Sequence, residues 1–426
     1  MNFWRRGGAW NYAGAMLKFW LPALVFSGVL SMRAENWPEF RGPTGQGHAS
    51  AAGLPLEWSS SNNVAWKVSI PGEGWASPVL VDGRLYLTCA VRGDKLSLHA
   101  LALDASDGKI LWDEAVFAPE NVAGIHQKNG HASPTPLVEG DRLYVHFGPN
   151  GTAALDLSGK VLWRNTDFHY PPVHGSGGSP VLVDDKLIFN CDAEKDPFVV
   201  ALNKKDGTVA WKVNRESDAK KKFSFCTPLL IEVDGHRELI SAGSNVVIGY
   251  DPSNGEEIWR VRYDGYSVVP RPVFGLGLIF MSTGFDHPKV LAIRAGGKGD
   301  VTDTHVAWTA TKGAPNTPSL LLSGEELYMV ADSGIVSCLD ARSGEVQWQE
   351  RIGGNCSASP VDAGDRLYVQ NEEGVGVVLA KGREFKKLAS NPLNERTLAS
   401  YAIGDGAIFI RSASHLFRIQ QASGKN

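Results

Sequence analysis

A unit of about 40–50 residues recurs along most of this 426-residue chain, and no other feature of the sequence limits the possible folds as strongly. Its first half is a Ser-Pro or Thr-Pro step, an apolar run, an acidic turn and a second apolar run, as in residues 77–86 and 179–188. The step recurs around Pro136, Pro228, Pro272, Pro318 and Pro360, and once without proline at Ser400-Tyr401. Two apolar runs joined by a short turn predict a β-hairpin, because glycine or aspartate in the turn accommodates positive φ.

The second half of the unit ends in a tryptophan and predicts another hairpin. It occupies residues 102–112 and returns at residues 154–163, 201–211, 249–259 and 338–348. The copy that ends at Trp308 carries an insertion, residues 295–304, and the copy that ends near Leu388 has no tryptophan. Structural roles on outer strands are expected for Trp66, Trp112, Trp163, Trp211, Trp259, Trp308 and Trp348. Each ring can bury ~150–250 Å² against the next unit.

Four strands at this period predict a propeller blade, and the hairpins give the number of blades. Eight first-half hairpins start near residues 76, 136, 180, 228, 272, 318, 360 and 401. The last has no outer strand after it, whereas a spare strand at residues 64–68 precedes the first. We therefore predict an all-β protein, one eight-bladed β-propeller of four-stranded antiparallel blades. The N-terminal strand closes the ring and removes two exposed sheet edges.

The N-terminal residues predict export. Residues 1–34 have the order of a secretory signal: basic residues, an apolar core over residues 19–30, and a small residue, Ala34, at the expected cleavage point. The core of about 12 residues is short for a ~30 Å hydrocarbon layer, although an uncleaved anchor remains the alternative. We assign residues 1–34 to a signal peptide, with Met16 as an alternative start, residues 35–62 to an N-terminal segment, 63–420 to the propeller and 421–426 to a tail. The expected location is periplasmic or extracellular.

Charge and cysteine content limit the partners and the chemistry. The formal net charge is −4, and residues 1–34 hold four of the 42 basic residues and no acidic one, which leaves 38 basic against 46 acidic residues, or −8. Such a body argues against a nucleic-acid partner, since phosphate binding needs a basic face. The five cysteines, an odd count, leave at least one thiol unpaired or bonded to another chain, and we expect buried apolar roles for them.

The pattern Ala-x-Asp-x-x-x-Gly-x-x-x-Trp at residues 102–112 resembles the tryptophan-docking motif of pyrroloquinoline-quinone-like propellers. The resemblance covers about residues 63–420. In addition, residues 37–43 are similar to the N-terminal segment of a group of exported bacterial propellers with this repeat. The superfamily contains quinoprotein alcohol and sugar dehydrogenases, and also the cofactor-free scaffold of the outer-membrane β-barrel assembly machine, the BamB-like branch.

The dehydrogenase branch uses pyrroloquinoline quinone and Ca²⁺ on the propeller axis. No two cysteines are adjacent here, so the vicinal disulfide of many such enzymes is absent, and no convergent set of the six to eight oxygen ligands of Ca²⁺ is recognisable. We therefore favour a non-catalytic, monomeric interaction or scaffold protein with a protein partner in the cell envelope and no cofactor. The alternatives are a dehydrogenase using the quinone and calcium, and a sugar- or metal-binding propeller, so enzymatic activity stays open.

Candidate ligand-binding residues lie in loops that lead into the innermost strands and meet at the channel mouth. Two unusual loops, residues 120–131 and 168–178, carry four of the chain's 11 histidines. The candidates are Trp75, His126, Lys128, His131, His169, His174, Arg271, Asn316 and Asn355. They predict a polar pocket for a small anion, a sugar or a metal, because histidine donates, accepts or ligates near neutral pH. The alternative is that they bond loop backbone and cap the channel. Residues 192–196 are expected to form a solvated turn.

Overall fold

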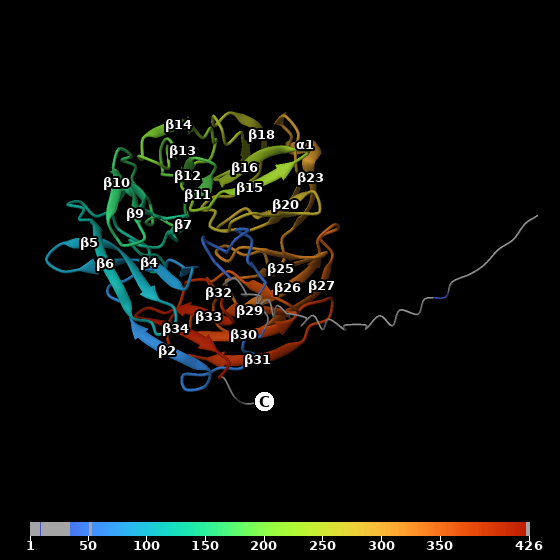
Figure 1. The fold of residues 1–426 in the computed structure, drawn as a ribbon. Helices are drawn as coiled ribbons and strands as arrows, with labels where there is room; N and C mark the ends of the chain where they lie inside the picture. The colour runs from blue at the N-terminus through green and yellow to red at the C-terminus, as the bar shows by residue number, and fades with distance from the viewer. Residues whose placement is uncertain (1–8, 10–34, 51–52, 423–426) are drawn as a thin grey trace, which may run out of the picture. The chain divides into compact units, whose positions relative to one another are not determined.

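The computed structural model describes residue 9, residues 35–50 and residues 53–422, so the predicted signal peptide lies outside the described residues apart from Ala9. Residues 35–50 and 53–422 belong to one compact unit. Its described part consists almost entirely of β-structure in eight sheets. Figure 1 shows these sheets arranged around an axis as the blades of a propeller, which confirms the predicted fold class and blade number.

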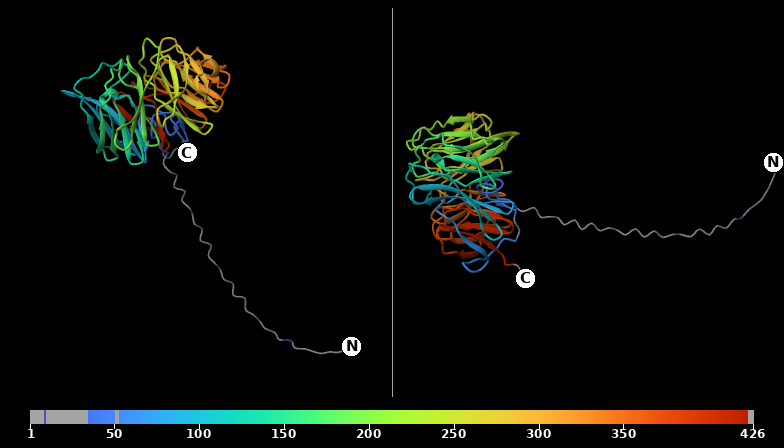
Figure 2. Two further views of the ribbon diagram at one scale, coloured as in Figure 1. Left: turned by 90° about the horizontal axis from the view of Figure 1, so that it is seen from above. Right: turned by 60° about the vertical axis from the view of Figure 1, so that its left-hand side comes forward.

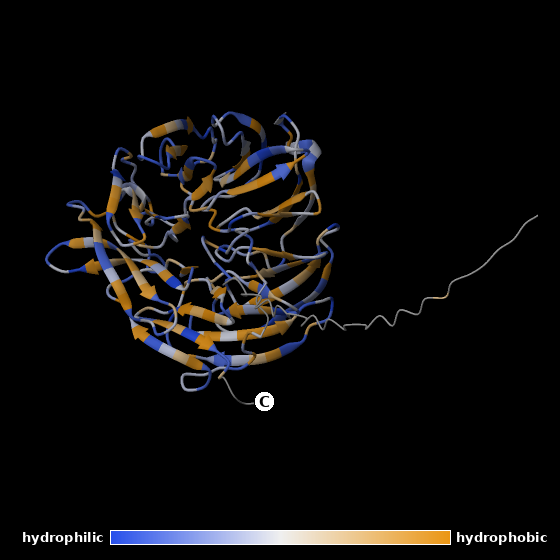
Figure 3. Ribbon diagram, in the orientation of Figure 1, coloured by the Kyte–Doolittle hydropathy of each residue, from blue (hydrophilic) through white to orange (hydrophobic). Residues whose placement is uncertain are grey.

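Each blade is an antiparallel sheet whose strands run from an inner to an outer position, with Figure 3 showing most apolar residues on the strands. Blade 1 consists of β3 (Val79–Val81), β4 (Arg84–Arg92), β5 (Leu96–Asp104) and β6 (Ile110–Phe117), and blade 2 of β7 (Leu137–Glu139), β8 (Arg142–His146), β9 (Thr152–Asp156) and β10 (Val161–Asn165). Blade 3 consists of β11 (Val181–Val183), β12 (Lys186–Cys191), β13 (Phe198–Asn203) and β14 (Val209–Asn214), and blade 4 of β15 (Leu229–Val233), β16 (His236–Gly243), β17 (Val246–Tyr250) and β18 (Glu257–Arg262).

Blade 5 consists of β19 (Val273–Gly275), β20 (Leu278–Ser282), β21 (Val290–Arg294) and β23 (Val306–Ala310), and blade 6 of β24 (Leu321–Ser323), β25 (Glu326–Val330), β26 (Ile335–Asp340) and β27 (Val346–Arg351). Blade 7 consists of β28 (Val361–Ala363), β29 (Arg366–Gln370), β30 (Val375–Ala380) and β31 (Lys387–Pro392), and blade 8 of β32 (Ala402–Gly404), β33 (Ala407–Arg411), β34 (His415–Gln420) and β2 (Val64–Ser69). Two short strands extend blades in parallel, β1 (His48–Ala49) beside β28 and β22 (Gly299–Asp300) beside β18. The short helices are the 3-10 helix η1 (Gly148–Asn150) and α1 (Thr302–His305).

The ring is closed by the N-terminal strand, as predicted. The strand β2 pairs antiparallel with β34, so that Trp66 lies opposite Arg418 and Ser69 lies opposite His415. Figures 1 and 2 show this blue strand beside the red C-terminal strands. Residues more than 300 positions apart therefore belong to one sheet, and truncation at either end would expose a sheet edge.

The outer-strand tryptophans join neighbouring blades by hydrogen bonds as well as by packing. The indole Nε1 of Trp66 donates to the Ala105 carbonyl of the next blade at 3.0 Å, and Trp211 donates to the Pro252 carbonyl at 3.1 Å. Trp112, Trp163, Trp308 and Trp348 make the equivalent bond. The ring of Trp211 covers Gly255, where a Cβ would lie 2.7 Å from the indole. This close approach explains the glycine of the repeat.

Blades 4 and 7 depart from this arrangement of the outer-strand tryptophan. Trp259 directs its Nε1 to Glu238 of its own blade at 2.7 Å, and β22 from the predicted insertion runs along its strand. In blade 7, which lacks an outer-strand tryptophan, Trp58 of the N-terminal segment stacks on Tyr368 with ring centroids 6.4 Å apart. The intrablade Tyr86–Trp112 pair has a similar separation of 6.2 Å. Trp58 therefore supplies from outside the repeat the ring that blade 7 lacks.

The N-terminal segment also crosses the inner strands and anchors to several blades. Trp37 is fully buried and exchanges backbone hydrogen bonds with Leu80 of blade 1. Arg41, 1% exposed, donates to the Leu320 carbonyl in blade 6 at 2.8 Å. Figure 1 shows this dark-blue segment between β7 and β25, near the axis. It thus ties blades together where the short inner strands make few contacts of their own.

Two expectations about polar and thiol groups have different outcomes. The five cysteines are all buried, as expected, and none of them is paired with another. The expectation of a solvated turn is wrong for Asp192, whose side chain is fully buried and bonds Arg215 at 2.9 Å. Arg215 also bonds Ser241, so this buried ion pair has the additional hydrogen bonds that such a pair needs. Among the described residues, no helix combines the length and the hydropathy needed to cross a membrane.

Candidate functional site

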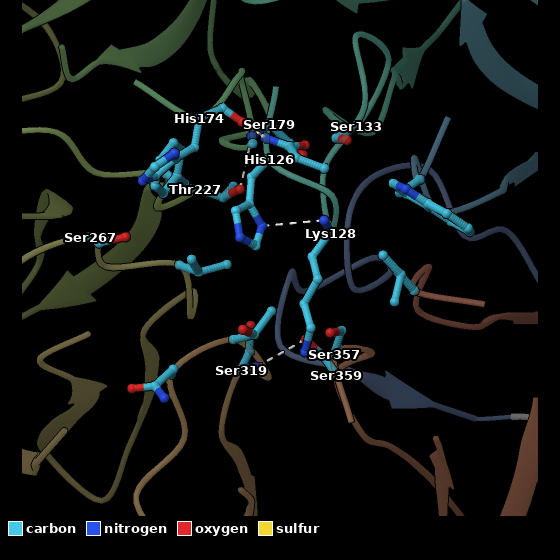
Figure 4. A pocket seen from close by; sticks show the side chains of 18 of the residues that line it. His126, Lys128, Ser133, His174, Ser179, Thr227, Ser267, Ser319, Ser357 and Ser359 are labelled. Carbon is cyan, nitrogen blue, oxygen red and sulfur yellow. Dashed lines mark hydrogen bonds between the residues drawn. The ribbon is translucent and has the colours of Figure 1, made fainter. Parts of the chain in front are cut away.

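A cavity of about 600 Å³ lies at the mouth of the channel, where all eight blades contribute lining residues and Phe40 of the N-terminal segment joins them. Figure 4 shows the lining side chains around this space. The cavity forms because the loops that lead into the inner strands meet near the axis. Pockets of this size accommodate a small molecule.

A circle of seven hydroxyl groups surrounds the cavity, each from the residue two positions before the inner strand in every blade except blade 5. The backbone N–H of Ser77 donates to Thr135 Oγ1, that of Thr135 to Ser179 Oγ, and that of Ser179 to Thr227 Oγ1, at 2.9–3.0 Å. The same bond links Ser319 to Ser359 and Ser359 to Ser400. The Ser/Thr step that marks the repeat therefore has a structural function: six of these hydroxyls each accept a bond from a buried backbone N–H of the neighbouring blade.

Blades 5 and 6 depart from the Ser/Thr-Pro pattern. In blade 6 the hydroxyl at the equivalent position belongs to Ser319, which directly follows Pro318 and has no proline after it. In blade 5 the position is taken by Arg271, whose backbone N–H still bonds Ser319 Oγ at 3.0 Å. Its guanidinium is buried and bonds Phe40, Pro228 and Glu39, which holds the N-terminal segment. Arg271 thus acts as an anchor in this structure.

The two histidine-bearing loops contact one another at one side of the mouth. The rings of His126 and His174 meet edge to face with centroids 5.5 Å apart. The His174 carbonyl accepts bonds from the His126 backbone N–H at 3.1 Å and from Asn129 Nδ2 at 2.8 Å. Burial, followed by the nearby His126 and Lys221, lowers the pKa of His174. This arrangement favours a neutral His174 imidazole in a fixed orientation.

Lys128 crosses the mouth from the loop of blade 2 to blade 7. Its Nζ bonds Glu372 Oε1 at 2.7 Å, and the same oxygen accepts a bond from Ser357 at 2.6 Å. Figure 4 shows the extended Lys128 side chain reaching toward Ser357 and Ser359. Nearby, the guanidinium of Arg396 lies 5.4 Å from the ring of Trp75 and bonds the Gln127 carbonyl. These contacts fix the blade 2 loop across the channel.

Aromatic side chains form one wall of the cavity. Phe223 meets Tyr266 edge to face at 5.9 Å, and Tyr266 meets Phe285 in the same way at 6.0 Å. Lys221 Nζ lies 4.4 Å from the centre of the Tyr266 ring and 3.1 Å from its hydroxyl. Phe285 is 54% exposed, which is high for a phenylalanine and leaves one ring face open. The wall therefore offers apolar faces beside a cationic group.

The oxygen atoms that line the cavity do not form a set of ligands for calcium. Asp332 is its one lining carboxylate, and both of its oxygens already accept bonds from Asn316 and Thr317. Within residues 35–50 and 53–422, no cluster of three or more His, Cys, Asp or Glu side chains is placed to hold a metal ion. Ca²⁺ takes six to eight oxygen ligands, several of them carboxylates. The residues present thus do not fit the calcium-bound quinone of the dehydrogenases.

The candidate residues predicted from the sequence divide into two groups. Trp75, His126, Lys128, His174 and Asn316 line the cavity together. His131, His169, Arg271 and Asn355 are not among its lining residues. His169 and Asn355 are exposed, and His131 is partly buried, which lowers its pKa. Ligand binding by either group stays a prediction.

Sequence reasoning missed most of the lining. The Ser/Thr step was interpreted from the sequence only as a marker of the repeat. A small polar residue at the same place in nearly every blade is the signal that points to a channel-facing position. The aromatic wall comes from the loops that lead into blades 4 and 5 and from the turn between β20 and β21, and Glu372, which bonds Lys128, comes from a turn between β29 and β30. No local spacing connects these residues, since only ring closure brings them together.

The fold and cavity define an eight-bladed propeller of pyrroloquinoline-quinone-like repeats. The chain belongs to the family described as "Outer membrane protein assembly factor BamB", whose model matches residues 58–222, 127–350 and 195–426. The crystal structure of BamB from Moraxella catarrhalis shares the fold, with a TM-score of 0.59 and 12% identity over 85% of this chain and 98% of that chain.

Curated relatives include members of both branches. Methanol dehydrogenase [cytochrome c] subunit 1 of Paracoccus denitrificans is 32% identical over 160 residues, which cover 32% of this chain and 24% of the relative. Outer membrane protein assembly factor BamB of Yersinia pestis is 23% identical over 250 residues, 54% of this chain and 58% of the relative. BamB of Xanthomonas campestris pv. campestris is 30% identical over 122 residues, 28% and 27% of the two chains. The matches to the dehydrogenase and the Xanthomonas protein thus span about a quarter of those relatives.

Proposed function

We propose that this protein is an exported, non-catalytic interaction protein of the cell envelope, a BamB-like scaffold that presents the mouth face of the propeller to a protein partner. Membership of the BamB family supports a role in assembly rather than catalysis. The observation that carries the proposal is the state of Asp332, the one carboxylate among the described residues that line the cavity, because both of its oxygens already accept bonds from the loop that leads into β24. A quinoprotein needs a Lewis-acid cation and a general base in fixed geometry at this place.

Loops on a rigid scaffold are where binding residues usually lie, and the blade 2 loop suits contact with a macromolecule. Val122 in this loop is 41% exposed, and the neighbouring residues Asn121 and Ala123 are exposed as well. Lys128 of this loop bonds Glu372 of blade 7, and Arg396, from the loop that leads into blade 8, bonds the Gln127 carbonyl, so contacts with two other blades hold the loop in place. A fixed, exposed loop pays little ordering entropy on binding.

The first experiment separates the scaffold from the dehydrogenase. Purified protein is titrated with pyrroloquinoline quinone and Ca²⁺, while heat, quinone absorbance and dye reduction with methanol, other simple alcohols and sugars are measured. We expect no turnover and no calcium-dependent binding. Tight calcium-dependent binding with turnover would replace the proposal with the dehydrogenase alternative, which the methanol dehydrogenase relative favours.

The second experiment locates the partner surface. A photo-crosslinking amino acid is placed at Val122 on the mouth face or, as the matched control, at Asp141 in the exposed turn between β7 and β8 on the opposite face. We expect a discrete envelope adduct only from position 122. The same adduct from both positions, or from position 141 alone, would contradict a partner at the mouth.

A further inference from the structure

The cavity has more hydrogen-bond donors than its own residues can use. Thr135, Ser179 and Thr227 each accept a backbone bond, and in the described part of the chain no protein acceptor is bonded to their hydroxyl protons. The same holds for Ser359 and Ser400. Because these residues line the cavity and a hydroxyl rotates about its C–O bond, their protons are available to oxygen acceptors on a bound molecule.

The charged side chains of the lining also favour a ligand that carries hydrogen-bond acceptors. Lys221 lies against the Tyr266 ring and bonds its hydroxyl, and among the described residues it forms no ion pair with a carboxylate. The lining carboxylate Asp332 accepts three bonds from Asn316 and Thr317 in the neighbouring loop that leads into β24. A cavity with free donors, an unpaired ammonium and no free carboxylate favours a ligand that is rich in oxygen acceptors and negatively charged.

The aromatic wall restricts the shape of that ligand. The Phe223–Tyr266 and Tyr266–Phe285 pairs are inclined by 84° and 67°, so the wall presents single ring faces at an angle. A planar aromatic molecule is held best between two parallel ring faces, and neither ring pair of this wall is parallel. A sugar ring has an apolar C–H face for one aromatic ring and hydroxyls for the circle of donors around it.

We propose that the channel mouth binds an acidic sugar, that is, a pyranose bearing a carboxylate, with its C–H face on Tyr266 or Phe285 and its carboxylate beside Lys221. The hydroxyl circle receives the sugar oxygens. This site goes beyond the scaffold role and does not depend on it, because a small ligand in the cavity and a protein on the surrounding loops use different groups. Binding therefore stands or fails separately from the crosslinking result.

The test is calorimetric titration of the full protein with digalacturonate, with neutral cellobiose and planar 2-naphthoate as comparison ligands. We expect digalacturonate to bind at least about tenfold more tightly than cellobiose and more tightly than naphthoate, with affinity that falls as NaCl is raised. Lys221→Gln should weaken digalacturonate binding about five- to tenfold and leave cellobiose nearly unchanged. Phe285→Ala should weaken the binding of both sugars.

Lys220→Gln is the matched control, because Lys220 is the exposed neighbour in the chain and does not line the cavity. It should change the affinity less than about twofold, as expected for a screened surface charge. Circular dichroism checks that every variant is folded. No heat with digalacturonate up to ~10 mM, an equal loss in the two lysine variants, or tighter binding of naphthoate would each overturn the acidic-sugar assignment.

Discussion

Replacement of Trp211 by alanine tests whether the repeated tryptophan holds adjacent blades together. The residue is 8% exposed, donates to Pro252 of the next blade at 3.1 Å and covers Gly255. Burial of ~150–250 Å² at about 25 cal/mol per Å² gives roughly 4–6 kcal/mol, and large-to-small core truncations of tryptophan cost about 3–5 kcal/mol. We expect the free energy of unfolding to fall by about 3–5 kcal/mol in Trp211→Ala.

The measurement is equilibrium unfolding in urea, followed by circular dichroism and fluorescence. If the transitions from the two probes coincide, unfolding is two-state and one free energy of unfolding can be derived for each variant. Val209→Ala is the control from the same strand, since Val209 is 44% exposed and should change stability by no more than about 0.5 kcal/mol. A loss below about 1 kcal/mol in Trp211→Ala would show that the tryptophan does not carry the blade contact.

Two further predictions concern ring closure and pH. Deletion of residues 63–70 removes β2 from blade 8 and should broaden and lower the thermal transition, whereas an unchanged transition would refute closure by this strand. Burial lowers the pKa of His146 to about 3, so the unfolded state takes up a proton near pH 6.5 before the folded state does. The contribution of the neutral His146 to the free energy of unfolding should therefore be fully present above pH 6.5. The free energy of unfolding should fall by up to ~1.4 kcal/mol per pH unit as pH drops from 6.5 to 5. His146→Gln should flatten this slope in urea titrations, and parallel slopes would refute it.

The candidate site was predictable where it depends on single loops. Residues 120–131 and 168–178 stood out in the sequence, and they place His126, Lys128 and His174 around one cavity. Arg271 shows the limit of such reasoning. Its position in the repeat points to the channel, but its guanidinium bonds the Phe40 carbonyl and Glu39 instead. Side-chain direction at a channel position depends on what occupies the channel, and the N-terminal segment does so here.

The sequence by itself determined the blades. Hairpin turns, alternating apolar runs and the docking motif act within 10 to 50 residues, so each blade can be predicted without knowledge of the others. Tertiary structure decided what fills the places where the repeat fails. Trp58 replaces the missing tryptophan of blade 7, and Trp259 turns to Glu238 of its own blade. The cavity likewise exists only in the closed ring, because its hydroxyls, aromatic rings and lysines come from strands and loops that are far apart in the chain and meet only at the axis.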